Sequence, residues 1–141
     1  MQNWVQEVIT KWRSETVKLN TPAIATDIEK TEAALNFKFP EDFREFYLVA
    51  NGFEDYDWQE HMFSLWPLER IIEEYESEDK RFIGFCDFFT SSLFIGFNKI
   101  QPGIFKIYNL KEHQNVEMGV LIAQSFEEVI GMINSSSDLL Y

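Results

Sequence analysis

Three short apolar runs in the second half of the chain constrain its fold more than any other feature. They cover residues 81–85, 93–97 and 104–108, and aromatic and β-branched side chains dominate each of them. Ser91 and Ser92 separate the first two runs, and residues 101–103 (Gln-Pro-Gly) separate the last two, so short turns join them. We therefore predict neighbouring antiparallel strands, and their nearly continuous apolar character predicts central strands covered on both faces.

The segments beside these runs predict further strands and helices. Residues 62–66 suit a short strand that Pro67 ends, and residues 118–123 suit a last strand. Apolar side chains at helical spacing between Leu68 and Tyr75 predict a helix. Ser125 and Glu128 have the spacing of a capping box ahead of a further apolar stretch, which predicts the start of a C-terminal helix.

The first third of the chain reads as three helices. Apolar residues recur at helical spacing from Trp4 to Trp12, which predicts an amphipathic helix over about residues 2–18. A second helix is expected from about Ala23 or Thr26 to Leu35, because Thr26 and Glu29 form another capping-box pattern.

Residues 39–42 (Phe-Pro-Glu-Asp) predict the start of the third helix, because proline is tolerated in a first turn and carboxylates favour the positive end of the helix dipole. Asn51 and Gly52 are expected to end it. The predicted fold class is α+β: a mostly antiparallel central sheet of about five to six strands, flanked by about four to five helices. We expect residues 1–141 to form a single domain, with a core over about 21–134 and a frayed tail over about 135–141.

Charge and composition narrow the class of partner. The net charge of −12 opposes binding to nucleic acid or to an anionic membrane and favours a basic protein partner. The first residues lack the pattern of a secretory signal, and no run of apolar residues is long enough for a membrane span, so we expect a cytoplasmic protein. The single cysteine, Cys86, is expected to be a buried, inert thiol.

No catalytic constellation is visible in the sequence. The two histidines, His61 and His113, are far apart and have no ligand-like neighbours at metal-binding spacing. No serine lies in a glycine-flanked elbow, and no glycine-rich loop suits a phosphate. We therefore expect no enzyme activity, no catalytic residue, no cofactor, no metal and no small-molecule substrate.

An acidic zone between Glu54 and Asp79 is the feature that most suggests binding. It holds ten acidic residues against one base, Arg70, so −9 of the net charge lies there. Carboxylates that alternate with aromatic side chains suit the interface with a basic protein. The alternative is that the carboxylates are the solvent-facing side of a helix and that Tyr56 and Trp58 cover the core. The predicted partner-binding residues are Glu54, Asp55, Tyr56, Asp57, Trp58, Glu60, Glu73, Glu74, Glu76, Glu78 and Asp79.

Several motifs follow one another in a fixed order along the chain. A glutamate-bearing helix leads to Leu35-Asn36-Phe37-Lys38-Phe39-Pro40, and an apolar helix and Asn51-Gly52 come next. Phe82-Ile83-Gly84 and residues 122–130 follow. In this order the motifs resemble the SUKH superfamily, the Smi/Knr-type group, over about Thr21 to Ile133. The chain departs from the family pattern at residues 85–89, where many members carry a glycine- and aspartate-rich turn.

The resemblance implies an α+β fold and, in bacteria, an immunity protein that binds and neutralises a cognate polymorphic or contact-dependent toxin, often a nuclease. We therefore interpret the chain as a non-enzymatic, cytoplasmic immunity protein that is a monomer or a weak homodimer. Its acidic and aromatic surface is expected to mask a basic toxin domain. The alternative is a regulatory or scaffold adaptor with the same fold and a different protein partner, as the eukaryotic relatives suggest.

Overall fold

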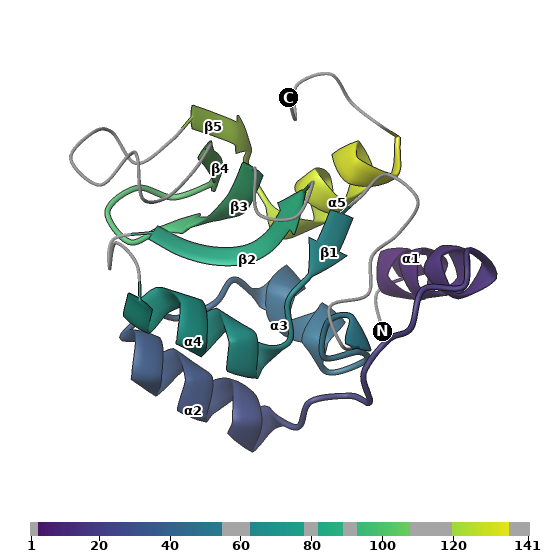
Figure 1. The fold of residues 1–141 in the computed structure, drawn as a ribbon, viewed down its shortest axis with the longest axis horizontal. Coiled ribbons are helices and arrows are strands. Elements are labelled where there is room, and N and C mark those ends of the chain that lie inside the picture. The colour runs from purple at the N-terminus through teal and green to yellow at the C-terminus, as the bar shows by residue number, and fades with distance from the viewer. Residues whose placement is uncertain (1–2, 55–62, 78–81, 89–92, 108–119, 136–141) are drawn as a thin grey trace.

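The computed structural model describes residues 3–54, 63–77, 82–88, 93–107 and 120–135. Within these ranges the chain forms five helices and five strands, which confirms the predicted α+β class (Figure 1). The helices are α1 (Asn3–Ser14), α2 (Ala25–Leu35), α3 (Glu41–Tyr47), α4 (Leu68–Ser77) and α5 (Phe126–Asn134). The strands are β1 (Phe63–Leu65), β2 (Phe82–Phe88), β3 (Leu93–Asn98), β4 (Ile104–Ile107) and β5 (Val120–Ala123).

The five strands form one antiparallel sheet in the order β1-β2-β3-β4-β5, so each strand pairs with its neighbours in the chain. The three apolar runs are its central strands, as predicted. Gly84 of β2 and Gly96 of β3 are opposite each other. A Cβ atom on Gly96 would lie 2.1 Å from the carbonyl oxygen of Ile83, so the two backbones approach too closely for any other residue there.

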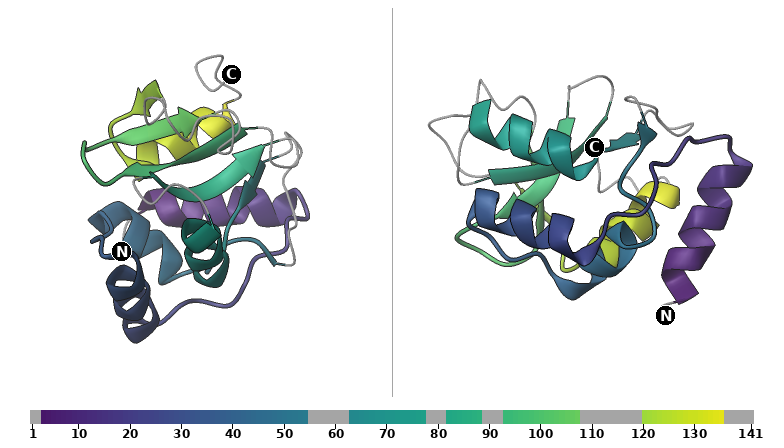
Figure 2. Two further views of the ribbon diagram at one scale, coloured as in Figure 1. Left: turned by 60° about the vertical axis from the view of Figure 1, so that its left-hand side comes forward. Right: turned by 90° about the horizontal axis from the view of Figure 1, so that it is seen from below.

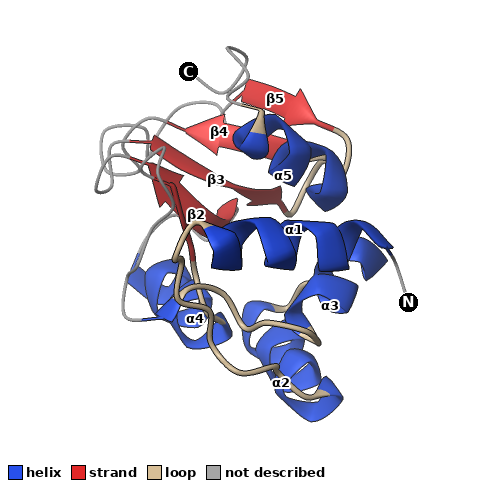
Figure 3. Cartoon of the chain, turned by 90° about the vertical axis from the view of Figure 1, so that its right-hand side faces the viewer, coloured by secondary structure: helices blue, strands red, loops and turns tan. Residues whose placement is uncertain are grey.

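One face of the sheet packs on an aromatic core from α3 and α5. The ring of Phe43, on α3, lies 5.9 Å from Phe85, 5.5 Å from Phe97 and 5.0 Å from Phe126 of α5, measured between centroids. Trp12 of α1 contacts this core from outside, and Figures 2 and 3 show α1 lying near α3 and α5. These contacts bury the aromatic side chains that the sequence supplies in abundance.

Trp66 covers part of the opposite face. Phe94 and Phe97 are three residues apart on β3, so their side chains point to opposite faces of the sheet. The ring of Trp66 lies 6.1 Å from Phe94, at 74° to it. α4 packs beside β2, and α2 packs outside α4 (Figure 1). Phe82–Asp87 and Phe94–Asn98 are all buried, which confirms that the central strands are covered on both faces.

One helix boundary and one helix cap differ from the prediction. α1 ends at Ser14 rather than near residue 18, because Thr16 adopts a left-handed conformation (φ 65°) that turns the chain. α2 begins at Ala25 with Ile24 at its N-cap, so Thr26 lies inside the first turn and does not cap the helix. From residue 136 onward, the predicted C-terminal tail lies outside the described residues.

Asn51 and Gly52 do not end α3, which stops at Tyr47. Instead they connect α3 to the start of α4. The Asn51 Oδ1 atom accepts a hydrogen bond of 2.9 Å from the backbone N–H of Leu68, the first residue of α4. Gly52 has φ +71°, and a Cβ atom there would lie 2.6 Å from the backbone of Trp66 and Pro67. The motif is therefore a tertiary junction rather than a helix terminator.

Candidate partner-binding surfaces

The described part of the acidic zone lies on α4 and beside its N-terminus. Glu69 and Glu73 are exposed and one turn apart on α4. Glu54 is exposed and follows Phe53, whose N–H donates to the carbonyl of Leu65 at 2.8 Å. Glu54 therefore lies beside β1, near the start of α4, at the beginning of residues 54–60, which we call the predicted acidic loop.

Arg70, the single base of the acidic zone, points inward. Its Nη2 atom lies 3.4 Å from Asp87 Oδ2, and its guanidinium carbon lies 4.5 Å from the centre of the Trp66 ring. The Trp66 indole N–H donates to Asp87 Oδ1 at 3.0 Å. Arg70 Nε also lies 3.7 Å from the carboxylate of Glu74. Glu74 is therefore ion-paired and half-buried, and Glu73 is exposed.

Most of the other predicted binding residues lie outside the described residues. These are Asp55, Tyr56, Asp57, Trp58, Glu60, Glu78 and Asp79, together with the side chain of Glu76. The two histidines, His61 and His113, also lie outside them. The acidic and aromatic loop accordingly stays a prediction.

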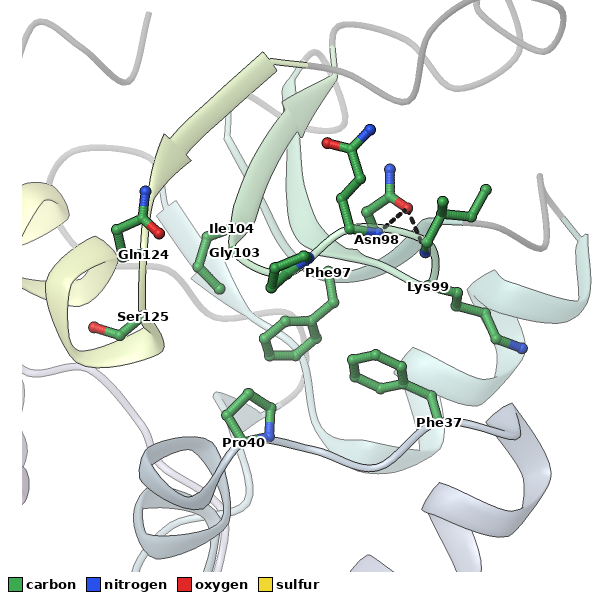
Figure 4. A pocket seen from close by; sticks show the side chains of 12 residues that line it. Phe37, Pro40, Phe97, Asn98, Lys99, Gly103, Ile104, Gln124 and Ser125 are labelled. Carbon is green, nitrogen blue, oxygen red and sulfur yellow. Dashed lines mark hydrogen bonds between the residues drawn. The ribbon is translucent and has the colours of Figure 1, made fainter.

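A mostly apolar hollow of about 350 Å³ opens at the turn between β3 and β4, and we call it the β3–β4 hollow (Figure 4). The rings of Phe37 and Phe97 form its floor, with centroids 5.3 Å apart, and the amide of Gln124 and the hydroxyl of Ser125 lie on its rim. Such a lining suits an apolar group and offers no acid–base chemistry.

Lys99 lies at the edge of the β3–β4 hollow, but its ammonium group is used by the fold. Nζ donates to the carbonyl of Leu35 at 2.8 Å and to the hydroxyl of Tyr75 at 2.9 Å. Leu35 is the last residue of α2, where a cation interacts favourably with the helix dipole. Lys99 therefore joins the ends of α2 and α4 to the end of β3.

A second hollow, of about 540 Å³, lies between α2 and α3, and we call it the α2–α3 hollow. Its lining combines apolar side chains with charged ones: Ala25, Ile28, Lys38, Phe39, Glu41, Arg44, Glu45 and Leu48. This surface is not among those that the sequence predicts. The one signal for it is an isoleucine directly before Ala25-Thr26-Asp27, where a polar cap residue is usual.

Two buried ionisable side chains stay protonated. Burial, and secondarily the charge of Asp87, raises the pKa of the Cys86 thiol well above its usual range. Burial likewise raises the pKa of Tyr47, whose hydroxyl donates to the carbonyl of Trp66 at 2.5 Å. Cys86 is buried as predicted, and neither group is held as an anion that could act as a nucleophile or base.

Neither a metal centre nor a membrane span is found in the described parts of the chain. Residues 3–54, 63–77, 82–88, 93–107 and 120–135 hold no group of three or more His, Cys, Asp or Glu side chains that could bind a metal ion. No helix in these ranges is long and apolar enough to cross a bilayer.

Comparison with known proteins identifies the family. No curated protein matches the chain. The sequence profile of the SMI1/KNR4 family (SUKH-1) matches residues 22–132. The matched region begins just before α2, includes all five strands of the sheet and ends within α5. It covers well over half of the 141 residues and agrees with the predicted resemblance. The chain therefore belongs to the SMI1/KNR4 family (SUKH-1).

Proposed function

We propose that this protein is a cytoplasmic bacterial immunity protein that neutralises a cognate toxin by binding it in a stoichiometric complex. The observation that carries the proposal is family membership across residues 22–132, because the SUKH family includes immunity proteins. Protection of this kind needs a surface that covers the toxin's active site and needs no chemistry of its own.

Charge supports a basic target. Glu54, Glu69 and Glu73 are exposed on one part of the described surface, and the chain as a whole carries −12. A nuclease cleft is basic because it binds phosphates, so an acidic protein could occupy it in place of nucleic acid. Complementary charge would also speed the encounter and suppress binding to acidic proteins.

Charge reversal in the acidic loop tests the proposed surface. Replacement of Asp55, Asp57 and Glu60 by Lys is expected to abolish protection when the variant is co-expressed with the toxin. Circular dichroism and the melting temperature of the purified variant would show that the fold is retained. Full protection by a folded triple variant would contradict the role proposed for this loop.

The structure offers a matched pair of single substitutions for the α4 part of the surface. Glu73 and Glu7 are both exposed glutamates inside helices, on α4 and α1 respectively. Glu73→Lys is expected to weaken binding of the toxin several-fold, whereas Glu7→Lys makes the same charge change and should leave the affinity within about twofold. Equal effects of the two variants would indicate that only net charge matters and that α4 is not at the interface.

A further inference from the structure

Two large apolar side chains are exposed at or beside the α2–α3 hollow: Leu48 lines it, and Ile24 directly precedes Ala25, which also lines it. Ile24 is 61% exposed and Leu48 is 45% exposed. Their segments meet where the N–H of Ala23 donates to the carbonyl of Tyr47 at 2.9 Å, which joins the residue before Ile24 to the residue before Leu48. Isolated exposed apolar residues are common on proteins, but a pair beside a hollow is typical of a contact site.

Ile24 is also unfavourable where it stands. It occupies the N-cap of α2, where Ser, Thr, Asp or Asn would accept a hydrogen bond from the first turn. An isoleucine side chain has no acceptor. The Asp27 carboxylate accepts a hydrogen bond from the Ile24 N–H at 3.4 Å, which leaves the N–H groups of the first turn without a side-chain cap at position 24. The helix would be more stable with a polar residue at position 24. A residue that is unfavourable for local structure is often kept because it serves a function such as binding.

The α2–α3 hollow has an apolar floor and a charged rim. Ile28 and Phe39 form the floor and are buried. Arg44 is partly neutralised, since its Nε lies 4.0 Å from Glu32, which also accepts from the N–H of Phe39 at 2.8 Å. Apart from Arg44, the rim carries two negative charges, on Glu41 and Glu45, and one positive charge, on Lys38. The rim has a small excess of negative charge.

We propose that the α2–α3 hollow is a docking site for the protein partner and that it receives a large apolar side chain with a basic residue beside it. The apolar pair of Ile24 and Leu48 would cover the inserted side chain, and Glu41 and Glu45 would pair with the basic group. The inference rests on the proposed function in so far as the partner is a protein. A second copy of this chain fits less well, because two molecules of charge −12 repel each other.

The substitution Ile24→Ser separates docking from a structural role, because the two predict opposite signs. A serine N-cap should raise the melting temperature by about 2–4 °C. The same change should weaken binding of the cognate toxin by about tenfold, because an apolar contact with the toxin is lost. Ile100→Ser is the matched control: Ile100 is 68% exposed and lies at the β3–β4 hollow instead. A lower melting temperature for Ile24→Ser, or binding that responds only to Ile100→Ser, would overturn the proposal.

A small probe tests the hollow without any toxin. N-acetyl-phenylalanyl-arginine amide, titrated into ¹⁵N-labelled protein, should shift the amide signals of Ala25, Phe39 and Leu48 at millimolar concentration. The analogue that ends in glutamate amide should bind about threefold more weakly because of the acidic rim. The Ile24→Ser, Leu48→Ser double variant should lose the response. Shifts confined to the β3–β4 hollow, or an unchanged response in the double variant, would contradict the assignment.

The outcomes also distinguish this inference from the proposed function. A toxin that is neutralised equally well by the wild type and by Ile24→Ser supports immunity but overturns the docking site. A dipeptide that binds as expected in a protein that neutralises no toxin supports the site and overturns immunity. Self-association of the wild type that Ile24→Ser abolishes would show a second copy as the occupant and would overturn the proposed partner. Sedimentation velocity measures this directly.

Discussion

At the scale of single residues, Asp87 joins the sheet to the start of α4. It is buried on β2 and accepts the indole N–H of Trp66, and its carboxylate faces the guanidinium of Arg70. In Asp87→Ala the Arg70 charge and the Trp66 donor lose this acceptor while staying largely buried. We expect the free energy of unfolding to fall by about 3–5 kcal/mol in urea titrations. Glu7→Ala, at an exposed site on α1, should change it by less than about 0.5 kcal/mol. Comparable losses in the two variants would refute the role of Asp87.

Cys86 predicts a pH dependence. Burial raises the pKa of its thiol in the folded protein, so the folded state keeps the proton while the unfolded chain releases it above about pH 8.5. This contribution to stability is present below that pH and is lost as the pH rises. Between about pH 9 and 10 the wild type should lose about 1 kcal/mol more of its unfolding free energy than Cys86→Ala does. Parallel curves for the two proteins would mean that Cys86 ionises equally in both states.

At the scale of helices and strands, the two capping-box patterns have different outcomes. Ser125 Oγ accepts from the N–H of Glu128 at 3.1 Å, so it caps α5 as predicted. Thr26 has the same sequence spacing but lies inside α2. Ser125→Ala should therefore cost about 1 kcal/mol of stability, and Thr26→Ala less than about 0.5 kcal/mol. Equal costs by thermal unfolding would show that the assigned start of α2 is wrong.

The elements themselves were largely predictable, because their signals are local. The apolar runs specify β2, β3 and β4, and helical spacing specifies the helices. The ends of the helices were less predictable, because tertiary contacts determine where a helix begins and ends. Hydrogen bonding between Ala23 and Tyr47 fixes the start of α2, and the Asn51 side chain is used at the start of α4. Neither contact leaves a pattern in the sequence near the helix that it affects.

At the scale of the whole molecule, the net charge of −12 predicts how a basic partner associates. Stopped-flow measurements should give an association rate that falls at least about tenfold between about 50 and 500 mM NaCl, because salt screens long-range attraction. The dissociation rate should change much less. An association rate that does not depend on salt would contradict electrostatic steering by the acidic zone.

The candidate surfaces show where sequence reasoning stops. The acidic zone is visible in the sequence because charge is a property of composition, although Arg70 and Glu74 prove to be paired. The α2–α3 hollow is not visible, since it forms only when residues from two helices and their connection meet. The exposure of Ile24 and Leu48 is likewise a result of the fold, and their residue type does not predict it.

Stoichiometric capture of a toxin is the central claim, and affinity purification from the native host tests it most directly. The tagged protein should retain one toxin-bearing protein, and mass measurement of the purified complex should give a fixed ratio. Co-expression should then protect cells from that toxin. A captured partner without toxicity, retained in the same fixed ratio, would favour the adaptor function, and toxicity that is undiminished by the bound protein would contradict immunity.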